Sequence, residues 1–394
     1  MINRRTNVTL FIIAIYCALM PLENVLDASL GGSVNKYVGL LAILIIFVKK
    51  LKVHELHINK YKHIPLMLFC VLCLTSYLWR FQDSGSVYRS IIFNMTVFTI
   101  ILSQYPLAYK DRRYIFHFCI FVGIVLSIMI ILGRGIATVS NTLDVRHTII
   151  IAGNAADENN LAVSIGITAL MALFLGIQSN KKIKKVLYFL LVLIILLAIL
   201  FTGSRGGLLA FIVGAAVLIY KLNDGIKPSK IIGISVLFVI LGFISQFFLS
   251  KDMLTRFTVA SVIEGKGTGR FTIWGNALKI FGESSLFRQV FGYGIGAFSK
   301  VYGSYNVLAY AAHNDLFELL IDLGILGLIV YLILLIRLFQ ISKRDPMKLA
   351  LLSMVLAASM SMELLVKKMF WLAIYFVLVT TYDEEEILNE STFC

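Results

Sequence analysis

The sequence is poor in charged residues and lacks a repeated half. Charged residues make up 15% of its 394 residues and hydrophobic residues 59%, and the mean hydropathy is +0.87. Because soluble domains carry about 25% charged residues, this composition excludes a protein whose main solvent is water. The alternating pattern of membrane barrel strands is absent. Two matching halves with paired broken helices are also absent, which argues against a repeat-built secondary transporter.

The few cysteines give no disulfide or metal framework. Cys17, Cys70, Cys73 and Cys119 lie in apolar segments, and Cys394 is the last residue given. Cys70 and Cys73 have the spacing of redox motifs, but they lie one turn apart in an apolar helix, so we assign them to packing. No convincing acidic cluster indicates a metal site either.

Long apolar runs follow one another along the whole chain. Each run of roughly 16 to 22 residues can cross a hydrocarbon core of about 30 Å as a helix. We therefore predict an all-α polytopic membrane protein of about 12 transmembrane helices. The predicted spans are residues 8–24, 37–53, 64–79, 87–103, 114–132, 159–177, 186–201, 204–220, 231–249, 316–339, 349–363 and 369–381. The predicted parts are nine helices (1–249), an extracytoplasmic loop with short interfacial helices (250–315), three helices (316–381) and a cytoplasmic acidic tail (382–394).

The basic residues indicate the orientation in the membrane. A formal net charge of +14 could suggest nucleic-acid binding, but the basic residues cluster in every second gap between spans. The positive-inside rule places such gaps in the cytoplasm, so we predict cytoplasmic termini and no nucleic-acid partner. Arg4 and Arg5 precede an apolar run as in a signal peptide, but no convincing cleavage site follows. We expect a retained first helix.

The longest outer gap, residues 250–315, is predicted to fold. It is rich in aromatic side chains, which disordered segments lack. Within it, Phe271, Trp274, Leu278 and Phe281 recur at helical spacing and predict an interfacial helix. Three alternating glycines then interrupt regular structure, and no strand precedes them, so we predict a turn of close backbone approach rather than a nucleotide loop. They are Gly292, Gly294 and Gly296.

Two arginines are candidates for binding an anion. Arg205 lies in the segment Thr-Gly-Ser-Arg-Gly-Gly (202–207) at the predicted outer start of a span, where helix N–H groups favour anions and the glycines would let a phosphate approach. Arg270 stands four residues before Trp274, so a cation and an aromatic face could together bind a phosphosugar. Alternatively, both arginines only contact lipid head groups.

His313 is the candidate proton acceptor. It precedes Asn314 and Asp315 where the outer gap enters the span 316–339. Histidine takes protons near neutral pH, although a lone histidine is often structural. We expect Asp315 to cap the helix, and Glu318 and Asp322, on one helical face, could orient the histidine or act as the base.

Other polar residues of the outer gaps are weaker candidates. Asp157, Glu158 and Asn160 are predicted first to cap the span 159–177 and only second to bind an acceptor. The remaining candidates are Arg89, Arg146, His147, Lys367 and Lys368.

Four short motifs follow one another along the chain: T-G-S-R-G-G, G-R-x3-W, G-x-G-x-G-x-F and A-H-N-D. In this order they resemble the O-antigen ligase and polymerase superfamily of bacterial surface polysaccharide assembly, and the resemblance is most specific over residues 201–338. It implies transfer of a glycan from an undecaprenyl diphosphate carrier to a sugar hydroxyl, outside the plasma (inner) membrane, without metal or cofactor. By the same resemblance, Arg205 and Arg270 hold the diphosphate and His313 activates the hydroxyl. The expected substrate-binding residues are Ser204, Trp274, Asn314, Asp315, Glu318, Arg89 and Lys367.

Three functions remain open from the sequence. We favour an inverting polymerase of O-antigen, capsule or exopolysaccharide; the alternative is an O-antigen ligase that moves the finished glycan to lipid A core or another acceptor. A flippase or transporter is less favoured, because the informative charges gather at the outer mouth rather than at mid-membrane depth. The expected partners are the lipid-linked donor, a lipid-linked or lipid A core acceptor, membrane lipids, a flippase and a chain-length regulator.

Overall fold

The computed structural model describes most of the predicted spans. The described residues are 8–22, 25, 34–53, 59–133, 136–138, 145–151, 154–222, 269–305 and 308–382. The predicted ninth span (231–249), the first part of the outer gap (250–268) and the acidic tail after residue 382 lie outside the described residues.

Every predicted span within the described residues coincides with a helix. The helices up to the outer gap are α1 (Val8–Leu19), η1 (Met20–Leu22), α3 (Val34–Val53), α4 (Lys60–Thr75), η2 (Ser76–Trp79), α5 (Ser86–Leu102), α6 (Tyr109–Ile131), α7 (Glu158–Ile177), α8 (Lys182–Phe201) and α9 (Arg205–Leu222). The later helices are α13 (Arg270–Glu283), α14 (Leu286–Phe291), α15 (Phe298–Tyr305), α16 (Asp315–Ser342), α17 (Pro346–Ser359) and α18 (Lys368–Leu378). The chain is therefore a helical membrane protein, as predicted.

Not every helix is both long and apolar enough to cross a membrane. Six helices of the described part are long and apolar enough: α4 continued by η2, α6, α7, α8, α9 and α16. By contrast, α17 has 14 residues and α18 has 11. At 1.5 Å per residue they extend about 21 Å and 16 Å, less than the hydrocarbon core of about 30 Å. The predicted spans 349–363 and 369–381 are thus helices that fall short of a full crossing on their own.

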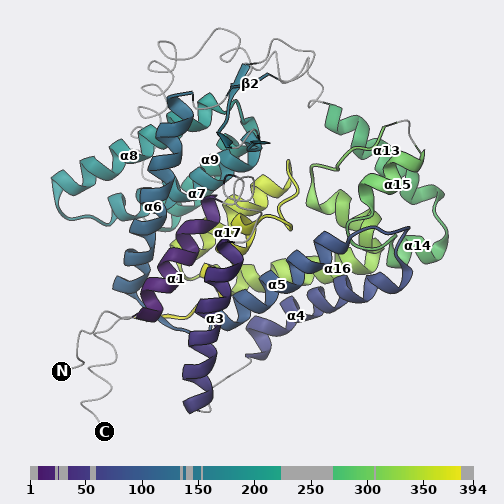
Figure 1. The fold of residues 1–394 in the computed structure, drawn as a ribbon, viewed down its shortest axis with the longest axis horizontal. Helices are drawn as coiled ribbons and strands as arrows, with labels where there is room; N and C mark the ends of the chain where they lie inside the picture. The colour runs from purple at the N-terminus through teal and green to yellow at the C-terminus, as the bar shows by residue number, and fades with distance from the viewer. Residues whose placement is uncertain are drawn as a thin grey trace.

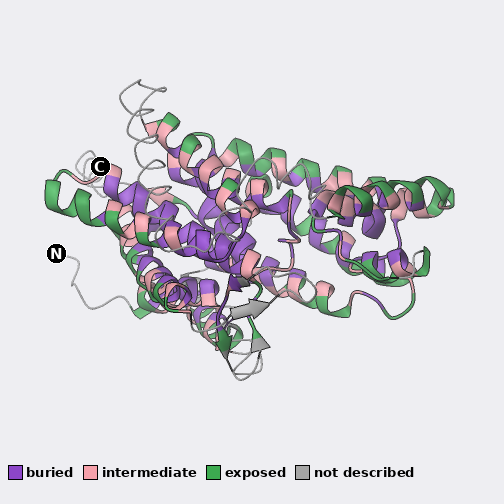
Figure 2. Ribbon diagram, turned by 90° about the horizontal axis from the view of Figure 1, so that it is seen from above, coloured by how far each residue is buried: buried purple, intermediate pink, exposed green. Residues whose placement is uncertain are grey.

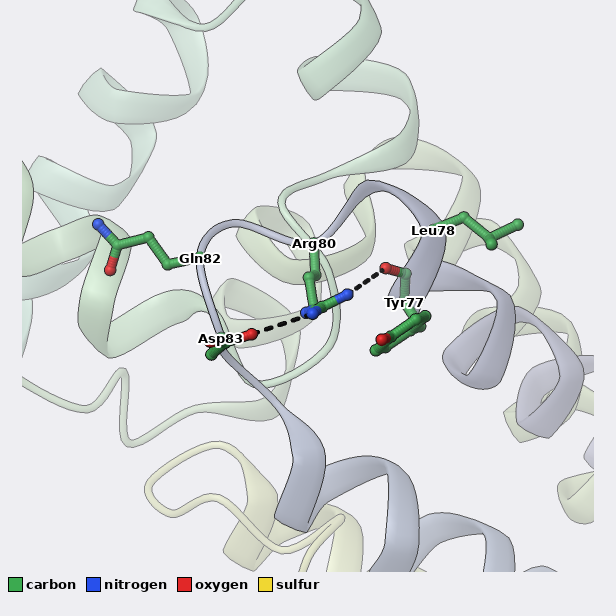
Figure 3. A pocket seen from close by; sticks show the side chains of 5 residues that line it. All are labelled: Tyr77, Leu78, Arg80, Gln82 and Asp83. Atoms are coloured by element: carbon green, nitrogen blue, oxygen red, sulfur yellow. Dashed lines mark hydrogen bonds and ion pairs between the residues drawn. The ribbon is translucent and has the colours of Figure 1, made fainter.

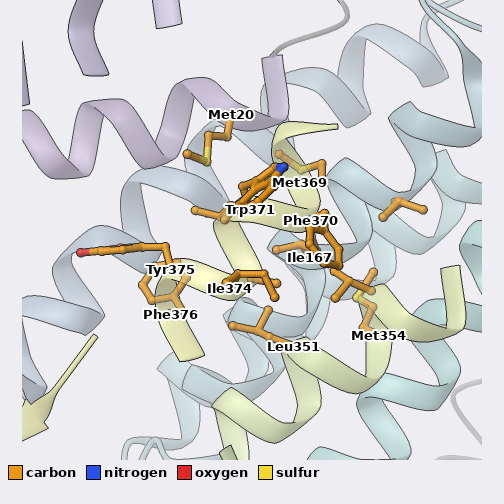
Figure 4. Close-up of a cluster of buried hydrophobic side chains, with 14 of the residues drawn as sticks. Met20, Ile167, Leu351, Met354, Met369, Phe370, Trp371, Ile374, Tyr375 and Phe376 are labelled. Carbon is orange, nitrogen blue, oxygen red and sulfur yellow. The ribbon is translucent and has the colours of Figure 1, made fainter. Parts of the chain in front are cut away.

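Two apolar helices occupy the centre of the molecule. In α7, every residue from Asn160 to Gly176 is buried, and this helix packs against α6, α8 and α9. Every residue of α18 from Met369 to Leu378 is buried. Figure 2 shows this buried centre, and Figure 4 shows Trp371, Phe370 and Tyr375 of α18 within it. A helix that is hydrophobic on all sides belongs in such an interior.

Small residues bring α9 close to its neighbours. A Cβ atom on Gly214 would lie 2.8 Å from Cβ of Met354 in α17, and one on Gly207 would lie 2.6 Å from Cβ of Ala162 in α7. Glycine at these positions lets helix backbones approach closely, as in many membrane helix pairs. The start of α9 is thereby fixed against α7.

In the described part of the chain, three two-stranded sheets supplement the helices. β1 (Leu107–Ala108) pairs in parallel with β6 (Thr381–Tyr382), whereas β2 (Ile136–Thr138) and β3 (Val145–His147) are antiparallel, as are β4 (Ile150–Ile151) and β5 (Asn154–Ala155). The purely helical prediction misses these strands because two or three residues are too few to establish a period-2 pattern.

The helices α13, α14 and α15 gather at one end of the molecule beside the start of α16 (Figure 1). They have a small core of their own, to which α13 contributes Ile273 and Ile280 and α15 contributes Phe298 and Tyr302. The predicted helix with Phe271 and Trp274 is confirmed as α13.

The glycine motif makes the predicted close approach. Gly292, Gly294 and Gly296 all have positive φ (72°, 98° and 75°). A Cβ atom on Gly294 would lie 2.8 Å from Cα of Arg80, and one on Gly292 would lie 2.5 Å from the backbone nitrogen of Leu323. Only glycine fits such positions without strain. We call the three helices α13, α14 and α15 the cap. The glycine turn joins the cap to the α4–α5 connection and to α16.

Candidate functional site

The start of α16 is held by its neighbours. The side chain of Asn314 accepts hydrogen bonds from the backbone N–H groups of Leu316 (2.9 Å) and Phe317 (3.3 Å) and caps the helix. The expectation that Asp315 is the cap is therefore wrong. Its carboxylate accepts instead from the N–H groups of Leu364 (2.9 Å) and Leu365 (3.5 Å). Asp315 thus fastens α16 to the α17–α18 connection.

His313 adopts an uncommon backbone conformation. Its φ is +50°, in the left-handed region that a histidine rarely occupies. Its backbone N–H donates to Oε1 of Glu363 at 3.4 Å, and the neighbouring Asn314 side chain donates to the carbonyl of Met360 at 3.1 Å. Strained residues of this kind persist where surrounding contacts hold them, and they cluster at functional sites.

Trp274 joins α13 to the His313 segment. Its indole N–H donates to the carbonyl of Ala312 at 2.9 Å, and its ring is stacked on Phe317 with centroids 5.2 Å apart. One face of the ring therefore packs against α16. Because Arg270 begins the same helix, these contacts place it on the side of α13 near His313.

The charges of the predicted residues act on one another. Burial lowers the pKa of Arg270, the charge of Arg205 lowers it further, and Asp157 opposes both. Burial also lowers the pKa of His313 below 6.5; Glu363 and Asp157 oppose this shift, and Arg270 adds to it. Arg205, Arg270 and His313, which are distant in sequence, therefore lie in one electrostatic environment. We call Asp157, Arg205, Arg270, His313 and Glu363 the charged cluster.

The segment 202–207 supports Arg205 structurally. Ser204 is 1% exposed, and its hydroxyl accepts the N–H of Gly207 at 3.2 Å, so it caps α9. The space beside Gly206 is filled by Ser361, and that beside Gly207 by Ala162. The expectation that these glycines admit a phosphate is wrong, because they serve helix packing. Arg205 itself is partly exposed at the first position of α9.

Residues of the outer gap before α7 are mainly structural. Asp157 caps α7 by accepting the N–H of Asn160 at 2.8 Å, as predicted. Arg146 forms an ion pair with Glu158 at 3.2 Å and donates to the carbonyl of Thr202 at 2.8 Å. These bonds link the start of α7 to the turn before α9. Asp157, the member of the charged cluster that acts on both Arg270 and His313, is thereby fixed at the start of α7.

Arg89 belongs to a different place on the surface. It donates to the carbonyl of Ser84 at 3.0 Å and lies 5.0 Å from the ring centroid of Tyr77. The segment between α4 and α5 lines an open hollow of about 410 Å³. In this hollow, Arg80 lies 3.9 Å from the ring centroid of Tyr77 and forms an ion pair with Asp83 (Figure 3). Lys367 is partly buried before α18, in the same connection as Glu363.

Two of the carboxylates have different settings from those expected. Asp322 accepts the backbone N–H groups of Gly296, Ala297 (3.0 Å) and Phe298 (2.7 Å), so it holds the glycine turn and is not available to orient His313. Glu318 is 5% exposed and lies 3.4 Å from the hydroxyl of Tyr88.

Sequence reasoning missed Tyr88 and Glu363. The hydroxyl of Tyr88 donates to Oε2 of Glu363 at 2.9 Å. Glu363 ends the predicted span 349–363, where no motif distinguishes it, and Tyr88 stands beside Arg89, which was chosen for its charge. Only the fold brings these two residues to His313. Among the described residues, no group of three His, Cys, Asp or Glu side chains is arranged to hold a metal ion.

Fold and site together define a polytopic helical membrane protein with an arginine and histidine cluster at the ends of several helices. Residues 189–332 match the model of the O-antigen ligase family, which confirms the resemblance to the O-antigen ligase and polymerase superfamily. The matched segment contains Arg205, Arg270 and His313, whereas Asp157 and Glu363 lie outside it. No curated protein matches the chain.

Proposed function

We propose that this protein is a lipid-linked glycan polymerase of the bacterial plasma membrane, with its active site on the outer face. The observation that carries the proposal is the electrostatic coupling of Arg205, Arg270 and His313. Members of the matched family are ligases or polymerases that act on lipid-linked glycans. A cluster of two cations and one titratable base suits transfer of a sugar away from a diphosphate.

Arg205 and Arg270 are the proposed diphosphate-binding residues. The charge of Arg205 lowers the pKa of Arg270, so an anion bound between the two arginines would favour the charged form of Arg270. A guanidinium also offers paired donors that match phosphate oxygens. Their fixed charges would stabilise the negative charge that develops on the leaving diphosphate. The proposed donor is a glycan on undecaprenyl diphosphate, and this role for the arginines calls for no metal ion.

His313 is the proposed general base. Because its pKa lies below 6.5, the imidazole is mostly neutral at pH 7 and can accept a proton. The acceptor hydroxyl oxygen attacks the anomeric carbon, its proton passes to His313, and the bond to the diphosphate breaks with its electron pair staying on the diphosphate. Attack opposite the leaving group inverts the anomeric centre. The second candidate is a ligase with the same chemistry, which the name of the matched family favours.

The test is the length of surface glycan, read on a gel, in a deletion strain that carries wild-type, Arg205→Ala, Arg270→Ala or His313→Ala protein at equal membrane levels. We expect wild-type protein to restore long chains and the three variants to leave single repeat units. Lys279→Ala is the matched control, because Lys279 lies on α13 with a side chain 74% exposed. Carrier-linked long chains in the deletion strain would instead identify a ligase. Full-length glycan in all variants would contradict the site.

A further inference from the structure

Four carboxyl groups lie near the start of α16, but the described neighbours compensate only some of them. Asp315 accepts two backbone N–H groups through Oδ1, while its Oδ2 is buried without a hydrogen-bond partner, and Asp322 accepts three backbone N–H groups. The third, Glu318, has no backbone donor: it lies 3.4 Å from the hydroxyl of Tyr88 and against the carboxyl group of Glu363. The fourth, Glu363, accepts from Tyr88 at 2.9 Å and from the backbone of His313 at 3.4 Å.

The different settings indicate which carboxyl carries a charge. A buried carboxylate without hydrogen-bond donors or a cation is costly, whereas the same group with a proton is not. Glu318 is 5% exposed and its carboxyl group lies against that of Glu363, so Glu318 is the member of this pair that keeps a proton. Glu363 is partly exposed and has two donors, and these can stabilise its charge.

We propose that Glu363 is the positioning residue of His313, while protonated Glu318 shares the hydroxyl of Tyr88 with it. This inference rests on the proposed function. The carboxylate of Glu363 holds His313 in its left-handed conformation through the backbone N–H. Its negative charge also stabilises the imidazolium that forms when His313 takes the proton of the acceptor hydroxyl. One charge is enough for this, and a second charge on Glu318 would repel the first.

The surroundings of His313 agree with this role. Glu363 and Asp157 favour its charged form, and Arg270 disfavours it. Asp157 caps α7 and is fixed there, and Arg270 is assigned to the diphosphate of the glycan donor. Glu363 is the group that both contacts the His313 backbone and acts on its charge.

The test compares Glu363→Gln with Glu318→Gln in the full-length protein, measured as the rate of transfer from a lipid-linked donor at a series of pH values. Glutamine in place of Glu363 keeps an oxygen for the His313 backbone but loses the charge. We expect a rate about 10- to 100-fold lower, a smaller effect than the about 100- to 10,000-fold loss on removing a general base. We also expect the acidic limb, the pH range in which the rate falls as His313 is protonated, to shift to lower pH. Glutamine in place of Glu318 resembles its protonated form, so we expect the acidic limb to stay where it lies in wild type. Glu283→Gln is the control for an unchanged rate, because the side chain of Glu283 is 52% exposed on α13.

Equal shifts of the acidic limb in Glu363→Gln and Glu318→Gln, or an unmoved limb in Glu363→Gln, would overturn the proposal. Tyr88→Phe provides a second measurement if Glu363→Gln fails to reach the membrane. It removes one hydroxyl from Glu363, and we expect a rate about fivefold lower, the effect of one hydrogen bond. An unchanged rate in Tyr88→Phe would count against the proposal. If His313→Ala keeps wild-type activity, the proposed base fails first, which separates the two ideas.

Discussion

The ring of Trp274 lies nearly parallel to that of Phe317, with an interplanar angle of 12° and 5.2 Å between centroids. With the hydrogen bond from its indole N–H to Ala312, this stack ties α13 to the start of α16. Arg270 begins α13, and His313 directly precedes the Asn314 cap of α16. The Trp274 contacts therefore control how the proposed phosphate-binding residue faces the proposed base.

Removing one Trp274 contact at a time should separate positioning from stability. Trp274→Phe keeps the stack and loses the hydrogen bond, so we expect about 1 kcal/mol less stability. Trp274→Leu loses both the aromatic stack and the hydrogen bond, and we expect a further loss of about 1 kcal/mol and a rate of transfer at least about tenfold lower. Thermal unfolding in detergent and the transfer rate are the measurements. A wild-type rate in Trp274→Leu would show that α13 needs no such anchor.

The two cluster arginines should act as a unit. Arg205→Lys and Arg270→Lys keep the charge but lose the paired donors, so we expect each to lower the transfer rate by about 10- to 100-fold. Because both arginines would bind one diphosphate, the double variant should lose less than the product of the two single effects. Rates at saturating donor, with Lys279→Ala as the control, measure this. Strictly multiplicative losses would mean that the arginines bind separate groups.

Much of this site could be predicted from the sequence because its parts lie in local motifs. Arg205 and His313 each stand at the start of an apolar helix, and the spacing of Arg270 and Trp274 predicts one helix. Glu363 could not be predicted, because its partners come from α5 and the His313 segment. The glycines after Arg205 were misassigned for the same reason: what fills the space beside a glycine depends on tertiary packing.

The fold shows the same division. Long apolar helices were located to within a few residues, since about 20 apolar residues in a row leave no other structure in a bilayer. The predicted ends of α17 and α18 lie a few residues beyond Ser359 and Leu378, because the residues that follow each helix are also partly apolar. The short strand pairs between α6 and α7 give no period to recognise. Hydropathy thus locates the helices, whereas the ends and connections, which carry the site, depend on tertiary contacts.

The pH dependence of transfer should follow His313. A base must be neutral to act, so the rate should be constant near pH 7 and above and fall as the pH drops through the pKa of His313, which lies below 6.5. Asp157 raises that pKa, so Asp157→Asn should move the acidic limb to lower pH. Asparagine also caps helices well, so α7 should keep its start. Glu283→Gln, at the far end of α13, should leave the limb in place. A limb that moves to higher pH in Asp157→Asn would contradict the assigned sign.

The glycine turn offers a test of how the cap is joined to α16. Gly292 has a φ of +72°, and a Cβ atom there would lie 2.5 Å from the backbone nitrogen of Leu323, which cannot move without shifting α16. We expect Gly292→Ala to destabilise the protein by more than about 1 kcal/mol and to lower activity, because the turn fixes the cap beside the charged cluster. Gly275→Ala is the matched control, because Gly275 lies within α13 and a Cβ atom there would have nothing within 4 Å. We expect this alanine to stabilise the protein by at most about 1 kcal/mol. Thermal unfolding and membrane levels of both variants measure the difference. Equal stability of the two variants would mean that α16 yields at this contact and that the turn does not fix the cap.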